Sequence, residues 1–279
     1  PAAIRAHMTF LADDLMEARE AGTRGFDIAA NYVAAQYALL GVKPAGDNGA
    51  YEQHVPLLAY KNASEGAFSI AGPDGKAAAL IFGEDYLPMA QAQAAEVAIT
   101  APLVFVGYGL VAPERGRDDY AGLDVKGKIV VMLNGAPSGL QTEERAHFGS
   151  ATVKREEAAR RGAVGVINLS TTSGEARRPF ARGLTGYRDW RMTWRETNGQ
   201  GHVRGVAAPG LLSISPKGAA KLFAGAPVAL DAALAAAETP DGLVKGFDLP
   251  FTAAVALKSE IETRESRNVV GLIEGSDPK

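Results

Sequence analysis

Residues 171–208 combine Arg, Trp and Gly side chains in a composition that fits ligand binding. An arginine guanidinium can hold a carboxylate through two parallel hydrogen bonds, and an indole ring offers a flat apolar surface. The segment shows no regular apolar period, and loops of this length are typically functional or mobile. Its arginines and tryptophans include Arg177, Arg178, Arg182, Trp190, Arg191 and Trp194. Alternatively, the tryptophans only anchor the loop to the domain, a usual role of buried aromatic side chains.

The histidines of the chain form no metal-binding pattern. They are His7, His54, His147 and His202. A catalytic zinc ion usually has three protein ligands drawn from His, Asp and Glu. Asp13 and Asp14 follow His7, but on a predicted helix they are better explained as solvated surface charges. His147 is likewise interpreted as a loop residue, so the sequence predicts no metal ligand and no catalytic residue on this chain.

A short glycine motif resembles a dinucleotide-binding fingerprint. Residues 107–112, GYGLVA, match G-x-G-x-x-A and follow a strand-like apolar run. The fingerprint requires a helix at this point, but Pro113 follows at once and the next residues show no apolar period. We therefore interpret the glycines as permitting a tight bend and predict no nucleotide site.

Asp118 and Asp119 are adjacent acidic residues that could be interpreted as paired catalytic carboxylates. Adjacent side chains on an extended segment point to opposite faces. Asp is also a common turn former. We expect one carboxylate to bond a backbone turn and the other to face water.

Composition limits the classes of function. The 279 residues include 47% apolar residues, enough for two cores, and the formal net charge is −3 without a long basic run. These values argue against a nucleic-acid partner and against a membrane partner. The absence of Cys excludes disulfides and thiolate metal sites. The chain begins with Pro1 rather than Met, which fits removal of an upstream signal and export to the periplasm or beyond, although a cytoplasmic location also fits.

The central part of the sequence predicts a strand, helix, strand unit. Apolar runs at 103–106, 128–133 and 164–169 predict strands, and Ser150 is placed to cap a helix that ends near Arg161. Glu–Arg pairs at positions 156 and 160, and 157 and 161, have favourable helical spacing. A further strand at 211–214 precedes a helix that begins at Ser215 and Pro216 and is closed by Gly225.

The two ends of the chain carry different patterns. Residues 1–60 are predicted to be helical, with two apolar stripes, and Gly41 is expected just after the second helix. A hairpin is predicted at 68–82, an alternating strand at 251–257 and a polar linker at 260–267. Residues 268–273, NVVGLI, predict a strand covered on both faces. Its partners are missing, so we expect a chain that has been cut short.

Four stretches together resemble a known family. They read HMTFLADDLMEAREAGTRG, AANYVAAQYALLGVKPAG, VFVGYGLVAPERGRDDYAGLDVKGKIVV and SRNVVGLIEGSDPK. In this order they resemble bacterial co-catalytic dizinc aminopeptidases of the leucyl aminopeptidase and glutamate carboxypeptidase-like metallopeptidase family. The third stretch resembles the protease-associated (PA) domain that one subgroup carries as an insert.

The resemblance implies an α+β fold. A PA-type domain, formed by a β-sheet with flanking helices and the strand, helix, strand unit, would be inserted between N-terminal helices and the first strand of a truncated α/β zinc-peptidase domain. The expected segments are 1–59 for the helices, 60–262 for the PA-type domain, and 263–279 for the linker and first peptidase strand.

The resemblance also implies a hydrolase. The parent would be an aminopeptidase that acts on peptides with two zinc ions, and the PA domain would cap its active site. The H-x-D pair that begins the family's ligand set is absent from this sequence, so this chain alone should bind no zinc and be inactive. We expect Arg178, Trp190 and Arg191 to form a rim that contacts substrate. The alternative is a stand-alone PA-type protein-interaction module, which a disordered segment 268–279 would favour.

Overall fold

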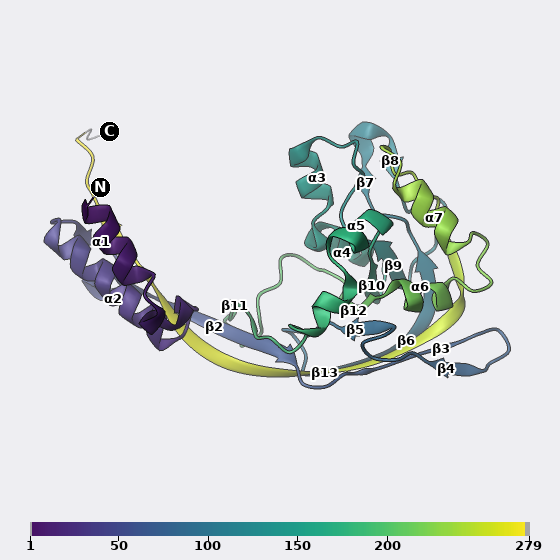
Figure 1. The fold of residues 1–279 in the computed structure, drawn as a ribbon, viewed down its shortest axis with the longest axis horizontal. Coiled ribbons are helices and arrows are strands. Elements are labelled where there is room, and N and C mark those ends of the chain that lie inside the picture. Colours follow the sequence, from purple (N-terminus) through teal and green to yellow (C-terminus); the bar gives the residue numbers. More distant parts are fainter. Residues whose placement is uncertain (1, 277–279) are drawn as a thin grey trace. The chain divides into compact units, whose positions relative to one another are not determined.

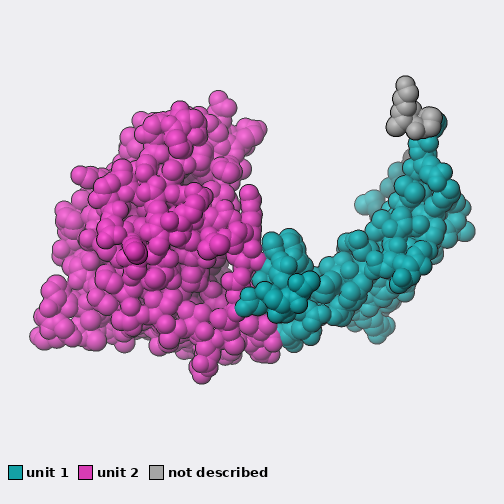
Figure 2. Space-filling view, turned by 180° about the vertical axis from the view of Figure 1, so that it is seen from behind, with its two compact units in different colours: residues 1–59, 192–202, 262–279 teal, residues 60–191, 203–261 magenta. Residues whose placement is uncertain are grey.

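The computed structural model describes residues 2–276. Pro1 and residues 277–279, which belong to the predicted segments 1–59 and 263–279, lie outside the described residues. The described chain divides into two compact units, whose elements are labelled in Figure 1 and which are coloured separately in Figure 2. Unit 1 comprises residues 2–59, 192–202 and 262–276, and unit 2 comprises residues 60–191 and 203–261.

Unit 2 is built on a mixed sheet. Parallel strands run in the order β6, β9, β10 and β12, with β5 antiparallel beside β12 and β13 antiparallel beside β6. Their bounds are β5 (Tyr86–Pro88), β6 (Glu96–Phe105), β9 (Ile129–Leu133), β10 (Gly165–Leu169), β12 (Gly210–Ile214) and β13 (Phe247–Val269). Strand β3 (Ala67–Ala71) pairs with β13 and forms a hairpin with β4 (Ala77–Ala79). The turn residues near Gly75 predicted this hairpin.

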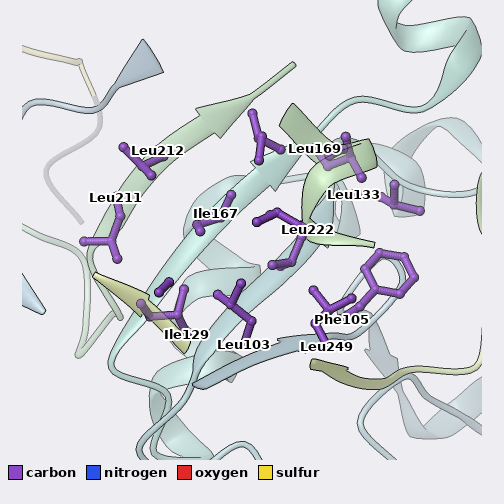
Figure 3. Packing of buried hydrophobic residues seen from close by; sticks show 14 of the residues in the cluster. Leu103, Phe105, Ile129, Leu133, Ile167, Leu169, Leu211, Leu212, Leu222 and Leu249 are labelled. Atoms are coloured by element: carbon purple, nitrogen blue, oxygen red, sulfur yellow. The ribbon is translucent and has the colours of Figure 1, made fainter. Parts of the chain in front are cut away.

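Helices cover both faces of this sheet. Ile129, Val131 and Leu133 of β9 join one apolar cluster, whereas Val130 and Met132 join the other. Figure 3 shows part of the first cluster, where Leu222 of α6 (Pro216–Leu222) lies among the strand side chains. Helix α7 (Leu230–Ala237) also joins that cluster, and α4 (Ala151–Arg160) contributes Ala158 to the second. Because every residue of such a strand is buried, continuous apolar runs were sufficient to predict them.

The predicted helix ends in unit 2 are largely confirmed. Ser150 and Ser215 occupy the N-cap positions of α4 and α6, but only Ser215 accepts a hydrogen bond from a helix amide, that of Gly218. The ion pair between Glu157 and Arg161 forms at 2.8 Å. The predicted pair between residues 156 and 160 is wrong, because Arg160 pairs with Glu157 instead.

The long segment 171–208 contains more regular structure than its composition indicated. It forms α5 (Thr172–Arg177), a 3₁₀-helix η4 (Phe180–Leu184) and β11 (Arg191–Trp194). Elsewhere in unit 2 the short elements are β7 (Val111–Ala112), the 3₁₀-helix η3 (Pro113–Arg115), β8 (Arg117–Asp118) and α3 (Thr142–Phe148). The prediction of an unstructured excursion was therefore wrong for these three short elements, which leave no detectable period in the sequence.

Unit 1 begins with the predicted helices. Its elements up to the first long strand are α1 (Ala2–Leu11), the 3₁₀-helix η1 (Asp14–Arg19), α2 (Arg24–Leu39), β1 (Lys43–Pro44), the 3₁₀-helix η2 (Asp47–Gly49) and β2 (Glu52–Asn62). Gly41 follows α2 with a φ of 70°, as expected for a residue after a helix C-terminus. The helical prediction for residues 1–60 was wrong beyond α2, because residues 52–62 form a strand.

The C-terminal part of unit 1 also differs from expectation. Residues 260–267 are not a linker, since β13 continues through them to Val269. Their charged side chains resemble a linker in sequence, but hydrogen bonding to the neighbouring strand β2 satisfies the backbone. Residues 268–273 do not form one central strand either. Asn268 and Val269 are the last residues of β13, Gly271–Leu272 (β14) pairs with β1, and Ile273 is 80% exposed.

Candidate functional site

Unit 1 exposes an apolar groove between its two helices. The groove has a volume of about 690 Å³ and is lined by residues of α1 and α2 and by the end of β13. Helix α1 has no buried residue, and Ile4 and Met8 are 65% and 64% exposed. Apolar side chains gathered in a groove, rather than scattered singly, typically mark an interaction surface or a ligand-binding groove. We define this surface as the helical groove.

Beside the helical groove, the segment that follows β13 packs on α2 and β1. Strand β14 pairs with β1, and the amide of Val270 donates to the carbonyl of Tyr51 at 2.7 Å. A Cβ atom at Gly271 would lie 2.6 Å from Val42 and 2.9 Å from the Tyr37 ring, so only glycine permits this close approach. The segment up to Glu274 is held further by an ion pair with Lys43 at 2.8 Å.

A polar pocket of about 530 Å³ lies in the same unit. Arg267 pairs with Asp27 at 2.9 Å and with Glu52 at 2.5 Å, and His54 Nε2 lies 2.7 Å from Glu265. All of these side chains are partly exposed. Because Arg267 pairs with both Asp27 and Glu52, these side chains form a surface ion-pair network that links α2, β2 and β13.

The histidines have ordinary partners. His7 Nδ1 lies 2.7 Å from the Tyr32 hydroxyl, and His202 stacks on Trp194 with ring centroids 3.7 Å apart. Asp13 accepts from the Leu15 amide at the start of η1 rather than facing His7. Within residues 2–276 no group of three or more His, Asp and Glu side chains is placed to hold a metal ion.

The predicted rim residues occupy three separate surroundings. Arg178 follows α5, is exposed, and its amide donates to the Gly174 carbonyl. Trp190 is half-buried, with the Lys61 ammonium 4.2 Å from its ring centroid. Arg191 is the exposed first residue of β11. The tryptophan ring thus contacts Lys61 of β2, and the substrate-contacting rim and the anchoring role both stay predictions.

Asp118 and Asp119 have distinct structural roles. Asp118 accepts from the Tyr120 amide and pairs with Arg161 at 3.0 Å, and its side chain is 39% exposed. Asp119 is only 3% exposed, pairs with Arg117 at 2.8 Å and accepts from the Leu110 amide. Burial raises the pKa of the Asp119 carboxyl, and these partners partly offset the rise. The turn was predicted correctly, but the buried ion pair was missed because Arg117 looked like a loop residue.

The glycine motif at 107–112 ends in a bend. Gly107 and Gly109 have φ values of 59° and 65°, and the residues that follow form β7 and η3 rather than a long helix. A Cβ atom at Gly107 would lie 2.9 Å from the Val244 carbonyl oxygen. The glycines therefore permit the bend that the sequence predicted, and Gly107 also permits close packing against Val244.

Lys154 is a buried cation that sequence analysis missed. Its Nζ donates to the carbonyl of Leu133 at 2.8 Å and to that of Gly135, and lies 5.5 Å from the Tyr108 ring centroid. Burial lowers the pKa of Lys154 to about 7. The available signal was its helical spacing: Lys154 and the apolar Ala158 are four residues apart on the face of α4 that packs on the sheet.

Comparison with known proteins gives structural matches only. No protein-family model and no curated protein matches the sequence. The chain is similar to an aminopeptidase from Aneurinibacillus sp. strain AM-1, at 22% identity and a TM-score of 0.47, over 95% of this chain and 47% of that one. It is also similar to BSAP, a zinc aminopeptidase from Bacillus subtilis, at 15% identity and a TM-score of 0.36, over 98% of this chain and 48% of that one.

The chain thus spans about half the length of the solved structures that it matches. Both TM-scores lie below 0.5. No helix within residues 2–276 is long and apolar enough to cross a membrane.

Proposed function

We propose that this chain is the non-catalytic N-terminal portion of a zinc-dependent aminopeptidase. In this proposal residues 60–262 form a PA-type domain that caps the active site and aids substrate selection. Residues 1–59 and 263–279 belong to the peptidase domain. The four sequence stretches that resemble this family support the proposal, because they lie in the expected order along the chain.

The observation that carries the proposal is the packing of residues 268–274 on α2 and β1. A binding module with a loose tail would leave this segment without partners. Instead, the Ala45 amide donates to the Val270 carbonyl at 3.1 Å, and Lys43 pairs with Glu274. The segment is therefore part of a helix and strand assembly, which fits the start of an α/β peptidase domain better than an appended tail.

The helical groove supports the same proposal. Ile4, Met8 and Leu11 line it beside Phe26 and Val33 of α2. Burial of an apolar side chain of this size contributes about 1.5–3 kcal/mol, so the groove would gain stability from a covering element. In the proposed parent, the sequence that follows Lys279 supplies this covering element together with the zinc ligands and the general base.

Activity measurements test the proposal directly. The parent protein, read from the gene beyond Lys279, should hydrolyse aminoacyl p-nitroanilides and should lose this activity when zinc is removed by a chelator. The 279-residue chain should show no activity with or without added zinc. A gene that stops at Lys279, or a parent that binds no zinc, would instead support the stand-alone PA-type interaction module.

A matched pair of variants tests the role of the groove. In the parent protein, Met8→Glu places a charge in the groove and should destabilise the peptidase domain, lowering activity together with thermal stability. Thr9→Glu changes the next residue of α1, which does not line the groove, and should leave both unchanged. Equal effects of the two variants would contradict a covered groove.

The substrate rim and the location are separate parts of the proposal. Arg178→Ala and Arg191→Ala in the parent protein should lower kcat/KM for peptides if the rim contacts substrate. Trp190→Ala should also lower kcat/KM, but it removes the ring that contacts Lys61 as well, so the two arginine variants are the cleaner test. Unchanged kcat/KM in both arginine variants would contradict a substrate-contacting rim.

Export, which fits an enzyme acting on external peptides, is tested by fractionating cells that produce the parent protein.

A further inference from the structure

Unit 2 contains a cleft that the proposed peptidase function does not use. Its volume is about 420 Å³. It lies where β9 and β10 end, because the segments that line it include those directly after the two strands. The other walls come from α3, α5 and the end of α7. In sheets with parallel strands, ligands commonly bind outside the carboxyl ends of the strands.

Hydrogen bonds between separate segments fix the walls of this cleft. The backbone amide of Asn134 donates to the Leu169 carbonyl at 2.7 Å, and this bond joins the ends of β9 and β10. The Tyr108 hydroxyl donates to the Ala237 carbonyl at 3.2 Å, and the Gly139 amide donates to the Pro240 carbonyl at 2.8 Å. These bonds hold the end of α7 against two loops, so the cleft is formed without a ligand.

Within the described residues, neither of the two arginines that line the cleft forms a hydrogen bond or ion pair with a carboxylate. Arg145 of α3 is exposed, and within residues 2–276 its side chain forms no hydrogen bond or ion pair. Arg177 of α5 uses only Nε, which donates to the Ser173 carbonyl at 3.2 Å. Both guanidinium groups therefore present free N–H donors. The Ser138 hydroxyl also lines the cleft and forms no hydrogen bond within the described residues.

The one carboxylate of the lining is already occupied. Glu238 accepts a hydrogen bond from the Ser173 amide at 2.7 Å. That bond lowers the pKa of the Glu238 carboxyl, with Arg177 adding a smaller effect. Two arginines and one glutamate leave the lining with a net positive charge, and the buried Lys154 lies beneath it on the Leu133 and Gly135 carbonyls. An anionic group is therefore the ligand that this electrostatic arrangement favours.

The shape of the cleft indicates more than a small inorganic anion. A volume of about 420 Å³ lies within the range of roughly 300–1,000 Å³ typical of organic ligand pockets. Besides its donors the lining contains the Tyr108 ring, Ala136 and Ala237. Planar guanidinium forks match carboxylates, and the apolar positions can contact the atoms that carry the carboxylate.

We propose that this cleft binds the carboxylate of a short peptide between Arg145 and Arg177, with Ser138 as a third donor. The proposal concerns unit 2 alone and does not depend on peptidase activity. It assigns the cleft a role in recognising carboxylate-bearing peptides, whether the carboxylate is the C-terminal group or an acidic side chain.

Titration calorimetry on the 279-residue chain tests the assignment. Acetyl-Ala-Ala-Ala with a free carboxylate should bind, and the same peptide with a terminal carboxamide should bind at least tenfold more weakly, as expected for loss of charge-assisted hydrogen bonds. Acetyl-Ala-Asp-Ala carboxamide distinguishes an acidic side chain from a C-terminal carboxylate. Acetate and phosphate test whether the peptide portion contributes to affinity.

Variants locate the site. Arg145→Gln and Arg177→Gln should each weaken binding of the free acid about tenfold, while Arg182→Gln, an exposed arginine of η4 outside the cleft, should not. Circular dichroism checks that each variant is folded. The proposal would be overturned if the acid and the carboxamide bound equally well, if neither Arg145→Gln nor Arg177→Gln changed the affinity, or if no binding occurred. Acetate or phosphate binding as tightly as the peptides would overturn its peptide part.

Discussion

Strand β9 of unit 2 and helix α1 of unit 1 both carry large apolar side chains, but their surroundings differ. All five residues of β9 (Ile129–Leu133) are at most 1% exposed, because helices pack on both faces of the sheet. Helix α1 (Ala2–Leu11) has no buried residue. The difference shows that an apolar pattern specifies which face is to be covered, whereas the covering element determines whether burial is achieved. Unit 2 contains its own covering helices, and unit 1 leaves the helical groove open.

The largest expected effect concerns the buried ion pair between Arg117 and Asp119 in unit 2. Asp119→Asn should lower the free energy of unfolding by about 3–5 kcal/mol, because it leaves the buried Arg117 guanidinium without a charged partner. Urea denaturation of the chain measures this loss. Asp118→Asn is the matched control: its carboxylate is more exposed, and the loss should stay near 1 kcal/mol. Equal losses would show that the Arg117 pair is not the reason.

A second pair of variants compares apolar side chains in the two units directly. Leu222→Ala removes a fully buried side chain of α6 and should cost about 2–5 kcal/mol. Met8→Ala in α1 should cost no more than about 0.5 kcal/mol in the chain alone, because its side chain already faces solvent. Hydrogen exchange of the β9 and α2 amides reports each unit separately. A large effect of Met8→Ala would mean that the groove is closed in solution.

The pH dependence of stability isolates Lys154. Burial lowers its folded-state pKa to about 7, whereas the unfolded value is about 10.4. Between these values the unfolded chain binds more protons, so stability from this group rises with pH. From pH 7 to 9 the wild-type chain should gain up to about 1.4 kcal/mol per pH unit relative to Lys154→Met. Parallel curves for the two proteins would contradict the lowered pKa. Asp119, Arg117 and Tyr108 lie around the ammonium, and the Asp119 charge raises its pKa, so Asp119→Asn should extend the gain to lower pH.

The smallest expected effect belongs to the surface ion pairs of unit 1. Arg267→Met removes the pairs with Asp27 and Glu52, all partly exposed, and should cost about 1 kcal/mol or less. The cost should shrink further in 1 M salt, where exposed charges are screened. Thermal melts at low and high salt measure it. A loss as large as that of Asp119→Asn would remove the distinction between surface and buried pairs.

The sequence predicted the parts of the fold that depend on local pattern. The continuous apolar runs that form β9 and β10, and the Ser215 and Pro216 start of α6, are specified within a few residues. Residues 260–267 were misinterpreted because both faces of that strand carry polar side chains, and only pairing with a distant strand makes it regular. Helix α7 was not predicted, since an alanine-rich segment shows little contrast between its faces.

The cleft could not be predicted for a related reason. Arg145 and Arg177 are more than thirty residues apart in sequence, and they share a cleft because both follow neighbouring parallel strands. Sequence analysis identified the Arg-rich segment but emphasised Arg178, whose neighbour Arg177 lines the cleft instead. Which arginine faces a ligand depends on where α5 ends, and that is set by tertiary packing rather than by composition.

The division of the chain has a practical consequence for anyone who wishes to produce one unit alone. One boundary between the units lies between Ala59 and Tyr60, inside β2. Another lies between Ile261 and Glu262, inside β13, so neither falls in a loop. Cloning boundaries are normally placed in exposed linkers. Cutting at these two points would leave strand ends with unpaired backbone groups, which promote aggregation. An expression vector for unit 2 should therefore retain several flanking strand residues on each side, capped by charged side chains.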